Sequence, residues 1–162
     1  MQQIQIGQRV SEATLQYIDG GVQRIDTPTL FGGRRLLLFA VPGAFTPTCS
    51  ERHLPGYVQH FDEFRQRGIE VACMAVNDPF VMQAWGAQQG VPPGLRMLAD
   101  GNAEFTRALG LELDASGYGM GLRSRRFALY AVDGVVRGLW VEAPGEFRVS
   151  AAEYVLAHLP PD

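Results

Sequence analysis

Two apolar runs, Leu36 to Val41 and Ile69 to Val76, the second with only Glu70 as a polar residue, constrain the fold more than any other feature of this sequence. A strand with one face in water alternates between apolar and polar residues, and neither run alternates. We therefore expect both runs to be buried strands of a sheet whose two faces are covered by helices. The chain is predicted to have a layered α/β architecture.

The segments around these runs predict helices that alternate with strands. Apolar residues at helical spacing predict one helix from about Pro47 to Arg67, which Gly68 ends. Further elements are expected as a helix from Pro79 to Gln89, a strand from Leu95 to Leu98, a helix from Ala103 to Leu109, and a terminal helix that begins with a capping box at Ser150 and Glu153.

Two hairpins are expected to complete the sheet. The dipeptide Asp133-Gly134 separates the apolar segments Arg126–Val132 and Val135–Val141 and is a strong signal for a two-residue turn. Residues 14 to 18 alternate weakly and are followed by Asp19-Gly20-Gly21, which predicts an amino-terminal hairpin. The expected sheet is therefore mixed, with parallel and antiparallel strands.

Composition bounds the class of protein. A chain of 162 residues is expected to form one domain over residues 1–162. The net charge of −3 provides no basic face for nucleic acid, and no apolar segment approaches the ~20 residues that span a bilayer. The start, Met1 to Ile6, lacks the basic and apolar parts of a secretory signal, so we expect a cytoplasmic location.

The two cysteines, Cys49 and Cys73, exclude several kinds of site. They form neither a CxxC motif nor the clustered ligands of a structural zinc site. Because Cys73 lies within the second apolar run, we expect it to be a structural packing residue. His53, His60 and His158 are not spaced as a metal set and are expected on the surfaces of helices, so no metal is predicted.

Cys49 lies where the first apolar run passes into the expected long helix. Thr46-Pro47 is typical of a helix opening, which places Cys49 in the first turn. Free backbone N–H groups and the positive end of the helix dipole favour a thiolate there. A cysteine that only packs is the commoner alternative, but the strand-to-helix junction and the neighbouring hydroxyls favour a reactive thiol.

The residues before this thiol form the pattern Pro42-x-x-x-Thr46-x-x-Cys49. This pattern, and the longer stretch Val41 to Ser50, resemble the active-site loop of the peroxiredoxins, and in particular of their type II subfamily from plants and bacteria. Further segments resemble that subfamily in order and spacing, namely VNDPFVM at 76–82, LADG at 98–101, LGLEL at 109–113 and RSRRFAL at 123–129.

The resemblance covers essentially the whole chain and implies a thioredoxin-like fold. That fold would have a mixed central sheet, helices on both faces and an N-terminal β-hairpin extension. The implied activity is that of a thiol-dependent peroxidase that reduces hydrogen peroxide and alkyl hydroperoxides through a sulfenic acid on Cys49. No cofactor is implied.

The resemblance also implies roles for individual residues. Cys49 would be the nucleophile, and the Thr46 hydroxyl would donate to the sulfur or accept from the peroxide, although a plain helix cap is an equal alternative for Thr46. Arg126 lies where the family places its catalytic arginine; considered alone, it would be a solvated arginine at a strand end. Alternation on an extended segment puts Arg123 and Arg125 on the opposite face, so we expect structural or rim roles for both.

Three residues of the loop are expected to line the substrate pocket, Pro42, Gly43 and Phe45. Pro42 has no N–H to donate and is expected to shield the sulfur from water. A simple strand terminator is the alternative reading of the local sequence.

The sequence identifies the thiol that is oxidised more clearly than the reductant that restores it. Some animal members of the wider family carry a resolving cysteine near Val149-Ser150, and this sequence has none there. A one-cysteine cycle that uses glutathione, with or without glutaredoxin, is therefore expected, and thioredoxin stays open as a partner. The family implies a homodimer. The alternatives are a peroxide sensor or interaction module with little turnover, and a thiol–disulfide exchange protein, which the missing CxxC disfavours.

Overall fold

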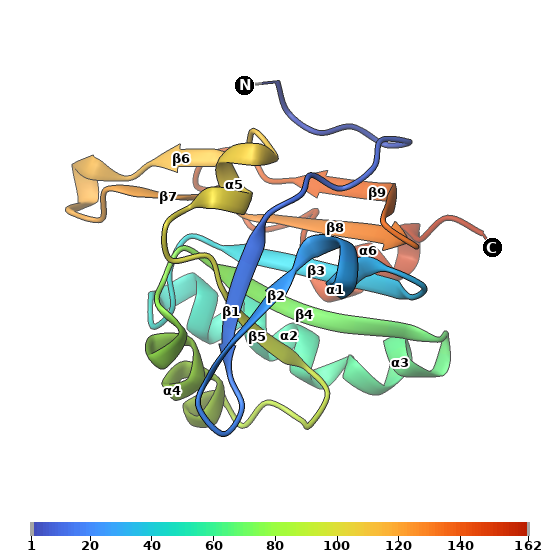
Figure 1. Cartoon of the computed structure of the whole chain (residues 1–162), viewed down its shortest axis with the longest axis horizontal. Coiled ribbons are helices and arrows are strands. Elements are labelled where there is room, and N and C mark those ends of the chain that lie inside the picture. The colour runs from blue at the N-terminus through green and yellow to red at the C-terminus, as the bar shows by residue number, and fades with distance from the viewer. Residues whose placement is uncertain (1, 162) are drawn as a thin grey trace.

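The computed structural model describes residues 2–161, which form a seven-stranded mixed sheet with helices on both faces (Figure 1). The strand order is β2-β1-β5-β4-β3-β8-β9. These strands are β1 (Thr14–Ile18), β2 (Val22–Asp26), β3 (Arg35–Val41), β4 (Ile69–Ala75), β5 (Arg96–Ala99), β8 (Phe127–Val132) and β9 (Val135–Val141). A separate two-stranded sheet is formed by β6 (Glu112–Asp114) and β7 (Leu122–Ser124).

The helices are short. They are α1 (Thr27–Phe31), α2 (Leu54–Gln59), α3 (Phe61–Gln66), α4 (Pro79–Gln89), α5 (Glu104–Ala108) and α6 (Ala152–His158), together with a π-helical turn η1 (Cys49–His53) and a 3₁₀ turn η2 (Ser116–Tyr118). Among residues 2–161, no helix combines the length and the apolar character needed to cross a bilayer.

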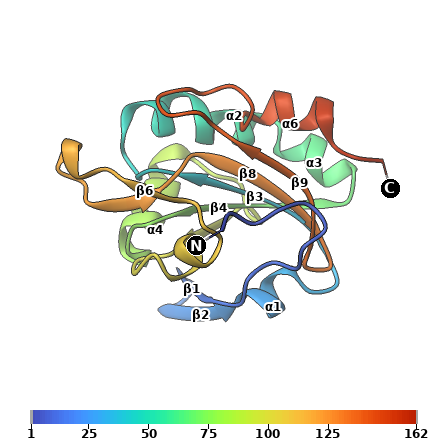
Figure 2. The same ribbon diagram turned by 90° about the horizontal axis from the view of Figure 1, so that it is seen from above.

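The two expected buried strands are confirmed as β3 and β4, which pair in parallel. Alternate side chains of β3 enter two separate hydrophobic clusters: Leu37 and Phe39 pack with residues of α2, α3, α4 and α6, whereas Leu36 and Leu38 pack with residues of α1 and α5. All four are fully buried, because each face of the sheet is covered. Figure 2 shows α2, α3 and α6 along one side of the sheet and α1 on the other.

Both expected hairpins are confirmed. β1 and β2 pair antiparallel, and β1 joins the edge of the sheet through β5, so the hairpin is an amino-terminal extension of it. β8 and β9 pair around Asp133 and Gly134, which both have positive φ, at 48° and 78°. This conformation suits the two-residue turn that Asp-Gly favours.

The single helix expected from Pro47 to Arg67 is wrong, because the segment is divided into η1, α2 and α3. The Leu54 N–H donates to the carbonyl of Cys49, five residues back, which gives η1 its π-helical register. Pro55 has no N–H with which to continue an α-helical ladder at this point. A second break occurs at His60, whose φ and ψ of −99° and 10° lie outside the helical region.

The capping box expected at Ser150 and Glu153 is also wrong. The residue that caps α6 is Ala151, which makes no side-chain bond to the helix. The Ser150 hydroxyl instead donates to Glu142, at 2.6 Å. Ser150 therefore bonds to Glu142, which precedes it by eight residues, and not to the first turn of α6.

The strand directions bring separate parts of the chain to one edge of the sheet. The parallel strands β3, β4 and β5 share that edge at their carboxyl ends. β8 runs antiparallel to β3 with Phe127 opposite Ala40, so the residue before β8, Arg126, lies beside the end of β3. The loop that carries Cys49 leaves β3 at the same end.

Candidate active site

Cys49 lies at the start of η1, just beyond the carboxyl end of β3, and has no exposed surface. Its Sγ accepts a hydrogen bond from Nη2 of Arg126 at 3.2 Å. A cationic donor beside a sulfur stabilises the thiolate over the neutral thiol. The structure thus brings together two of the three residues expected to be catalytic, although 77 positions separate them in the sequence.

Arg126 makes a second contact through its other terminal nitrogen. Nη1 lies 2.9 Å from Nδ1 of His53. The ring of Phe147 lies on one side of the guanidinium, with its centroid 5.9 Å from Cζ. The side chain is therefore held at both nitrogens and along one face.

The expectation that His53 lies on a helix surface is wrong, since its side chain is fully buried. Burial lowers the pKa of His53 well below its ordinary value, and the positive charge of Arg126 lowers it further. Its Nε2 lies 3.2 Å from the carbonyl oxygen of Ser150. The sequence signal for this position was the spacing from Cys49 to His53 of four residues, which places both on one side of a helical turn.

Thr46 closes the loop before η1. Its hydroxyl donates to the carbonyl of Gly43 at 2.7 Å, and its own carbonyl accepts from the N–H of Ser50 at 2.9 Å. The residue that precedes η1 is Thr48, whose side chain makes no capping bond. The Thr46 hydroxyl donates its hydrogen to a carbonyl within the loop. The lone pairs of its oxygen can still accept a hydrogen bond from a substrate.

The three expected pocket residues are placed differently from one another. Pro42 lines a cavity next to Arg126, whereas Gly43 and Phe45 lie outside its lining. A Cβ on Gly43 would lie 3.0 Å from Met120 Cε and 3.3 Å from Thr46 Cγ2, so a larger residue there would require these side chains to shift. Phe45 has φ of 66° and is 49% exposed.

The cavity beside Arg126 has a volume of about 260 Å³ and is mainly apolar. Apart from Pro42 and Arg126, the lining includes Leu113, Tyr118, Met120 and Pro144. The first three belong to β6, η2 and the segment that leads to β7, which the sequence did not indicate as part of the site. An apolar cavity that ends at a guanidinium suits a small molecule with one polar end.

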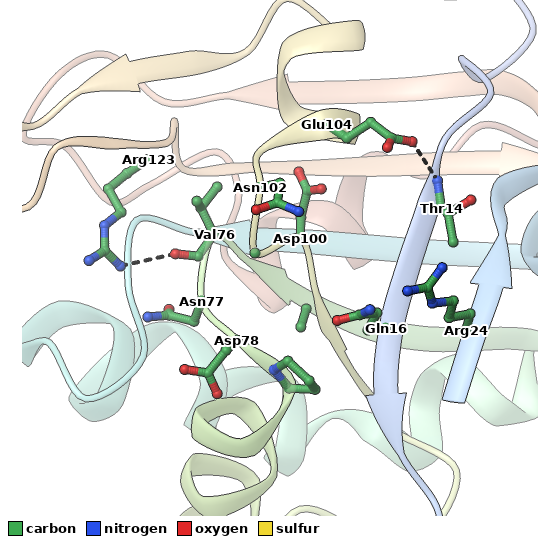
Figure 3. Close-up of a pocket in the computed structure, with 13 residues that line it drawn as sticks. Thr14, Gln16, Arg24, Val76, Asn77, Asp78, Asp100, Asn102, Glu104 and Arg123 are labelled. Atoms are coloured by element: carbon green, nitrogen blue, oxygen red, sulfur yellow. Dashed lines mark hydrogen bonds between the residues drawn. The ribbon is translucent and has the colours of Figure 1, made fainter. Parts of the chain in front are cut away.

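Arg123 and Arg125 both donate to backbone carbonyls, and Arg125 lines the same cavity as Arg126, although the opposite face was expected for it. Arg123 donates from Nε to Met120 and from Nη1 to Val76, at 2.9 and 3.1 Å. In Figure 3 its side chain points to the Val76 carbonyl at the border of a polar pocket near the carboxyl ends of β4 and β5. Arg125 donates to the carbonyl of Glu142 at 3.0 Å.

Asn77, which Figure 3 shows next to Val76, ties the Cys49 loop to β4. Its side-chain oxygen accepts from the N–H of Ala44 at 2.9 Å. On the other side, Trp85 in α4 donates to the hydroxyl of Ser50 at 3.0 Å. Both contacts hold the loop and η1 against the sheet.

Glu142 anchors the segment that covers the site, and the sequence did not single it out. The residue is 4% exposed, and its carboxylate accepts from the N–H of Arg148 and from both the N–H and the hydroxyl of Ser150, at 2.6 to 2.8 Å. Burial alone would raise the pKa of Glu142, but the hydrogen bonds from Ser150 and Arg148 outweigh it and hold the pKa below its ordinary value.

Cys73 is fully buried in β4, where a packing residue was expected. Burial raises the pKa of the Cys73 thiol well above its ordinary value, and the nearby Cys49 raises it further. A thiol in that state is a poor nucleophile. Among residues 2–161, no group of three or more His, Cys, Asp or Glu side chains could hold a metal ion.

Comparisons with known proteins found relatives of similar sequence and of similar fold. A profile of the Redoxin family matches residues 5–156. Peroxiredoxin-2E, chloroplastic, of Arabidopsis thaliana is 47% identical over 96% of this chain and 69% of its own length, and Peroxiredoxin-2B of the same plant is 43% identical over 98% and 100%. A crystal structure of reduced Prx3 in complex with hydrogen peroxide from Vibrio vulnificus covers 97% of this chain and 99% of its own, with 50% identity and a TM-score of 0.92.

These similarities confirm the expected thioredoxin-like fold and the resemblance to type II peroxiredoxins. They contradict the expected cytoplasmic location. Relatives at 47% identity from Arabidopsis thaliana and from rice (Oryza sativa) carry chloroplastic names. The absence of a secretory pattern in the first residues was therefore not sufficient ground for assigning a compartment.

The carboxylate of Glu142 gives a pH-dependent prediction. Because its pKa is lowered in the folded protein, its contribution to stability is present above its ordinary value of 4.5 and is lost as the pH falls through the folded value. We expect Glu142→Gln to lower the free energy of unfolding by about 2 kcal/mol at neutral pH. The difference from the wild type should shrink below pH 4.5 when both are unfolded in urea at a series of pH values.

The exposed Glu146 of the same segment is the control. Glu146→Gln should change stability by less than about 0.5 kcal/mol. A difference in the free energy of unfolding between Glu142→Gln and the wild type that stays constant down to acidic pH would contradict the prediction.

Proposed function

This chain belongs to the peroxiredoxins of the Redoxin family, and we propose that the sulfur of Cys49 is the atom that attacks the peroxide. The observation that carries the proposal is the 3.2 Å contact between Nη2 of Arg126 and Sγ of Cys49. A thiol that only packs has no need of a cationic donor, and burying such a donor is costly unless it has an acceptor to bind.

In the reaction, the thiolate attacks the terminal oxygen of the hydroperoxide and displaces the other oxygen. A sulfur–oxygen bond forms as the O–O bond breaks, so the sulfur is oxidised to a sulfenic acid and the peroxide is reduced to an alcohol or water. The departing oxygen gains negative charge and takes up a proton. The Arg126 guanidinium stabilises that charge, and the lone pairs of the Thr46 hydroxyl accept from the O–H of the peroxide.

The cavity supports alkyl hydroperoxides as substrates together with hydrogen peroxide. Its lining by Leu113, Tyr118 and Met120 gives an alkyl chain an apolar surface, while the peroxide end lies toward Arg126. The solved Vibrio vulnificus relative in complex with hydrogen peroxide supports peroxide as the reacting group.

Recycling by glutathione, with or without glutaredoxin, is the proposed second half of the cycle. The thiolate of glutathione attacks the sulfenic sulfur, which gives a mixed disulfide and water, and a second thiol then releases Cys49. The burial and raised pKa of Cys73 support a cycle without a resolving cysteine from that position. Since Cys49 is also fully buried, we expect η1 to open before glutathione can reach the sulfur.

A homodimer is proposed for the assembled protein. Phe45 and Phe80 are exposed apolar side chains that follow the carboxyl ends of the adjacent strands β3 and β4. Tyr118, in η2, is also exposed. We propose that these side chains form part of the association surface, since a contiguous exposed apolar patch is typical of such surfaces.

Substitution of each cysteine in turn tests which sulfur reacts with the peroxide. Cys49→Ser should abolish peroxide consumption in a coupled assay with glutathione and glutaredoxin, because a hydroxyl at that place is not ionised at neutral pH. Cys73→Ser should retain most of the activity, within about threefold, because it only alters packing. A similar loss in both variants would rule out the one-cysteine cycle.

The reductant is tested by supplying glutathione with glutaredoxin in one arm and thioredoxin with its reductase in the other. Steady turnover is expected in the first arm, and intact-protein mass measurement should find a glutathione adduct on the oxidised wild type. The Cys49→Ser variant, which cannot form the adduct, is the control. A single burst of peroxide consumption with no recycling in either arm would instead support a sensor.

The assembly is tested by sedimentation velocity at micromolar concentration. The wild type should sediment with twice the mass of the 17.8 kDa chain, and Phe80→Asp should shift it toward the monomer, since a desolvated carboxylate opposes association. A wild type that stays monomeric throughout would refute the dimer.

A further inference from the structure

We propose that His53 is a positioning residue that accepts a hydrogen bond from Nη1 of Arg126 and so directs Nη2 of the same guanidinium to the sulfur of Cys49. The inference rests on the proposed function, because it takes the contact between Arg126 and Cys49 as the catalytic one. His53 is a buried titratable group in direct contact with Arg126, and the peroxidase reaction itself assigns it no step.

The hydrogen-bond partners of the ring fix its tautomer. Nε2 faces the carbonyl oxygen of Ser150 at 3.2 Å, and a carbonyl can only accept, so Nε2 carries the proton. Nδ1 faces Nη1 of Arg126 at 2.9 Å, and a guanidinium can only donate, so Nδ1 must present a lone pair. Both contacts are satisfied together only by the neutral ring with hydrogen on Nε2.

The surroundings favour the same neutral form. The side chain is fully buried, and burial together with the charge of Arg126 lowers the pKa of His53 well below its ordinary value. An imidazolium would carry a second N–H toward Arg126, so two donors and two positive charges would face each other. The neutral ring removes both conflicts.

The plane of the ring is held by aromatic side chains. The centroids of Phe39, Tyr57 and Phe147 lie 5.0, 5.7 and 5.1 Å from that of His53. A ring packed on several sides cannot rotate to offer its nitrogen in another direction.

The carbonyl that orients Nε2 is itself fixed. The hydroxyl of Tyr57 donates to the same Ser150 oxygen at 2.7 Å, and the N–H and hydroxyl of Ser150 are bound by Glu142. Hydrogen bonds therefore run without a gap from Glu142 through Ser150, His53 and Arg126 to the sulfur of Cys49.

This chain of contacts explains what His53 adds. An arginine side chain has many rotamers, and ordering it at one acceptor costs conformational entropy. With Nη1 anchored on His53, the rigid geometry of the guanidinium sets the direction of Nη2. His53 does not touch the peroxide and acts only through Arg126.

The test compares two substitutions, both in the Cys73→Ser background so that one cysteine remains. His53→Phe keeps an aromatic ring in the cluster but removes the acceptor, whereas the amide oxygen of His53→Asn can replace Nδ1 as an acceptor for Arg126. We expect His53→Phe to lower the second-order rate constant with hydrogen peroxide about tenfold and His53→Asn to lower it by less than about threefold. The ultraviolet thiolate absorbance of Cys49 at neutral pH should fall in the first variant and be retained in the second.

Equal impairment of the two variants, or wild-type rates and absorbance in both, would overturn the inference. Circular dichroism and urea unfolding control for the fold. Should His53→Phe fail to fold, nitrogen-15 NMR of the wild-type imidazole decides the question. The inference requires a neutral ring with hydrogen on Nε2 and an accepting Nδ1, and an imidazolium or hydrogen on Nδ1 would refute it.

The outcomes also distinguish this inference from the proposed function. Peroxidase activity that survives in Cys49→Ser would show that Cys49 is not the nucleophile. That result would refute the proposed function independently of the role of His53. Loss of activity in Cys49→Ser together with unchanged His53 variants would leave the peroxidase assignment in place and remove only the positioning role.

Discussion

The guanidinium of Arg126 is the group on which the rest of the site depends. It is half-buried, and it meets two acceptors of different kinds, the sulfur of Cys49 and a ring nitrogen of His53. Removing a cation from water is costly unless its N–H groups find acceptors. The sulfur of Cys49 and the ring nitrogen of His53 supply those acceptors to Arg126. The thiol is thereby placed in an environment that stabilises negative charge, which is the condition for nucleophilic attack by sulfur.

The sheet provides the geometry for this meeting. Cys49 follows β3, and Arg126 precedes the antiparallel strand β8, so the pairing of Ala40 with Phe127 brings the two ends together. A shift of one residue in that pairing would turn Arg126 to the opposite face. Contacts from Asn77 to Ala44 and from Trp85 to Ser50 then hold the loop in place. The segment after β9 closes over the site, with Glu142 bound to Ser150.

Local patterns predicted the elements that local physics controls. The two apolar runs predicted β3 and β4, and Asp133-Gly134 predicted the hairpin of β8 and β9, because burial on two faces and positive φ impose specific residue types. The prediction of a single helix from Pro47 to Arg67 failed because it gave no weight to the missing N–H of Pro55. His53 was assigned to a helix surface because its neighbours in the sequence are polar, and its burial results from η1 packing against Phe39 and Tyr57.

By itself, the sequence determined which sulfur is a candidate nucleophile, which strands are buried and which family the chain resembles, since these follow from residue types within short stretches. The tertiary structure decided which side chains meet. Arg126 is 77 positions from Cys49 and 73 from His53, and His53 is 97 from Ser150. Contacts over such separations depend on strand register and close packing, which no local pattern encodes.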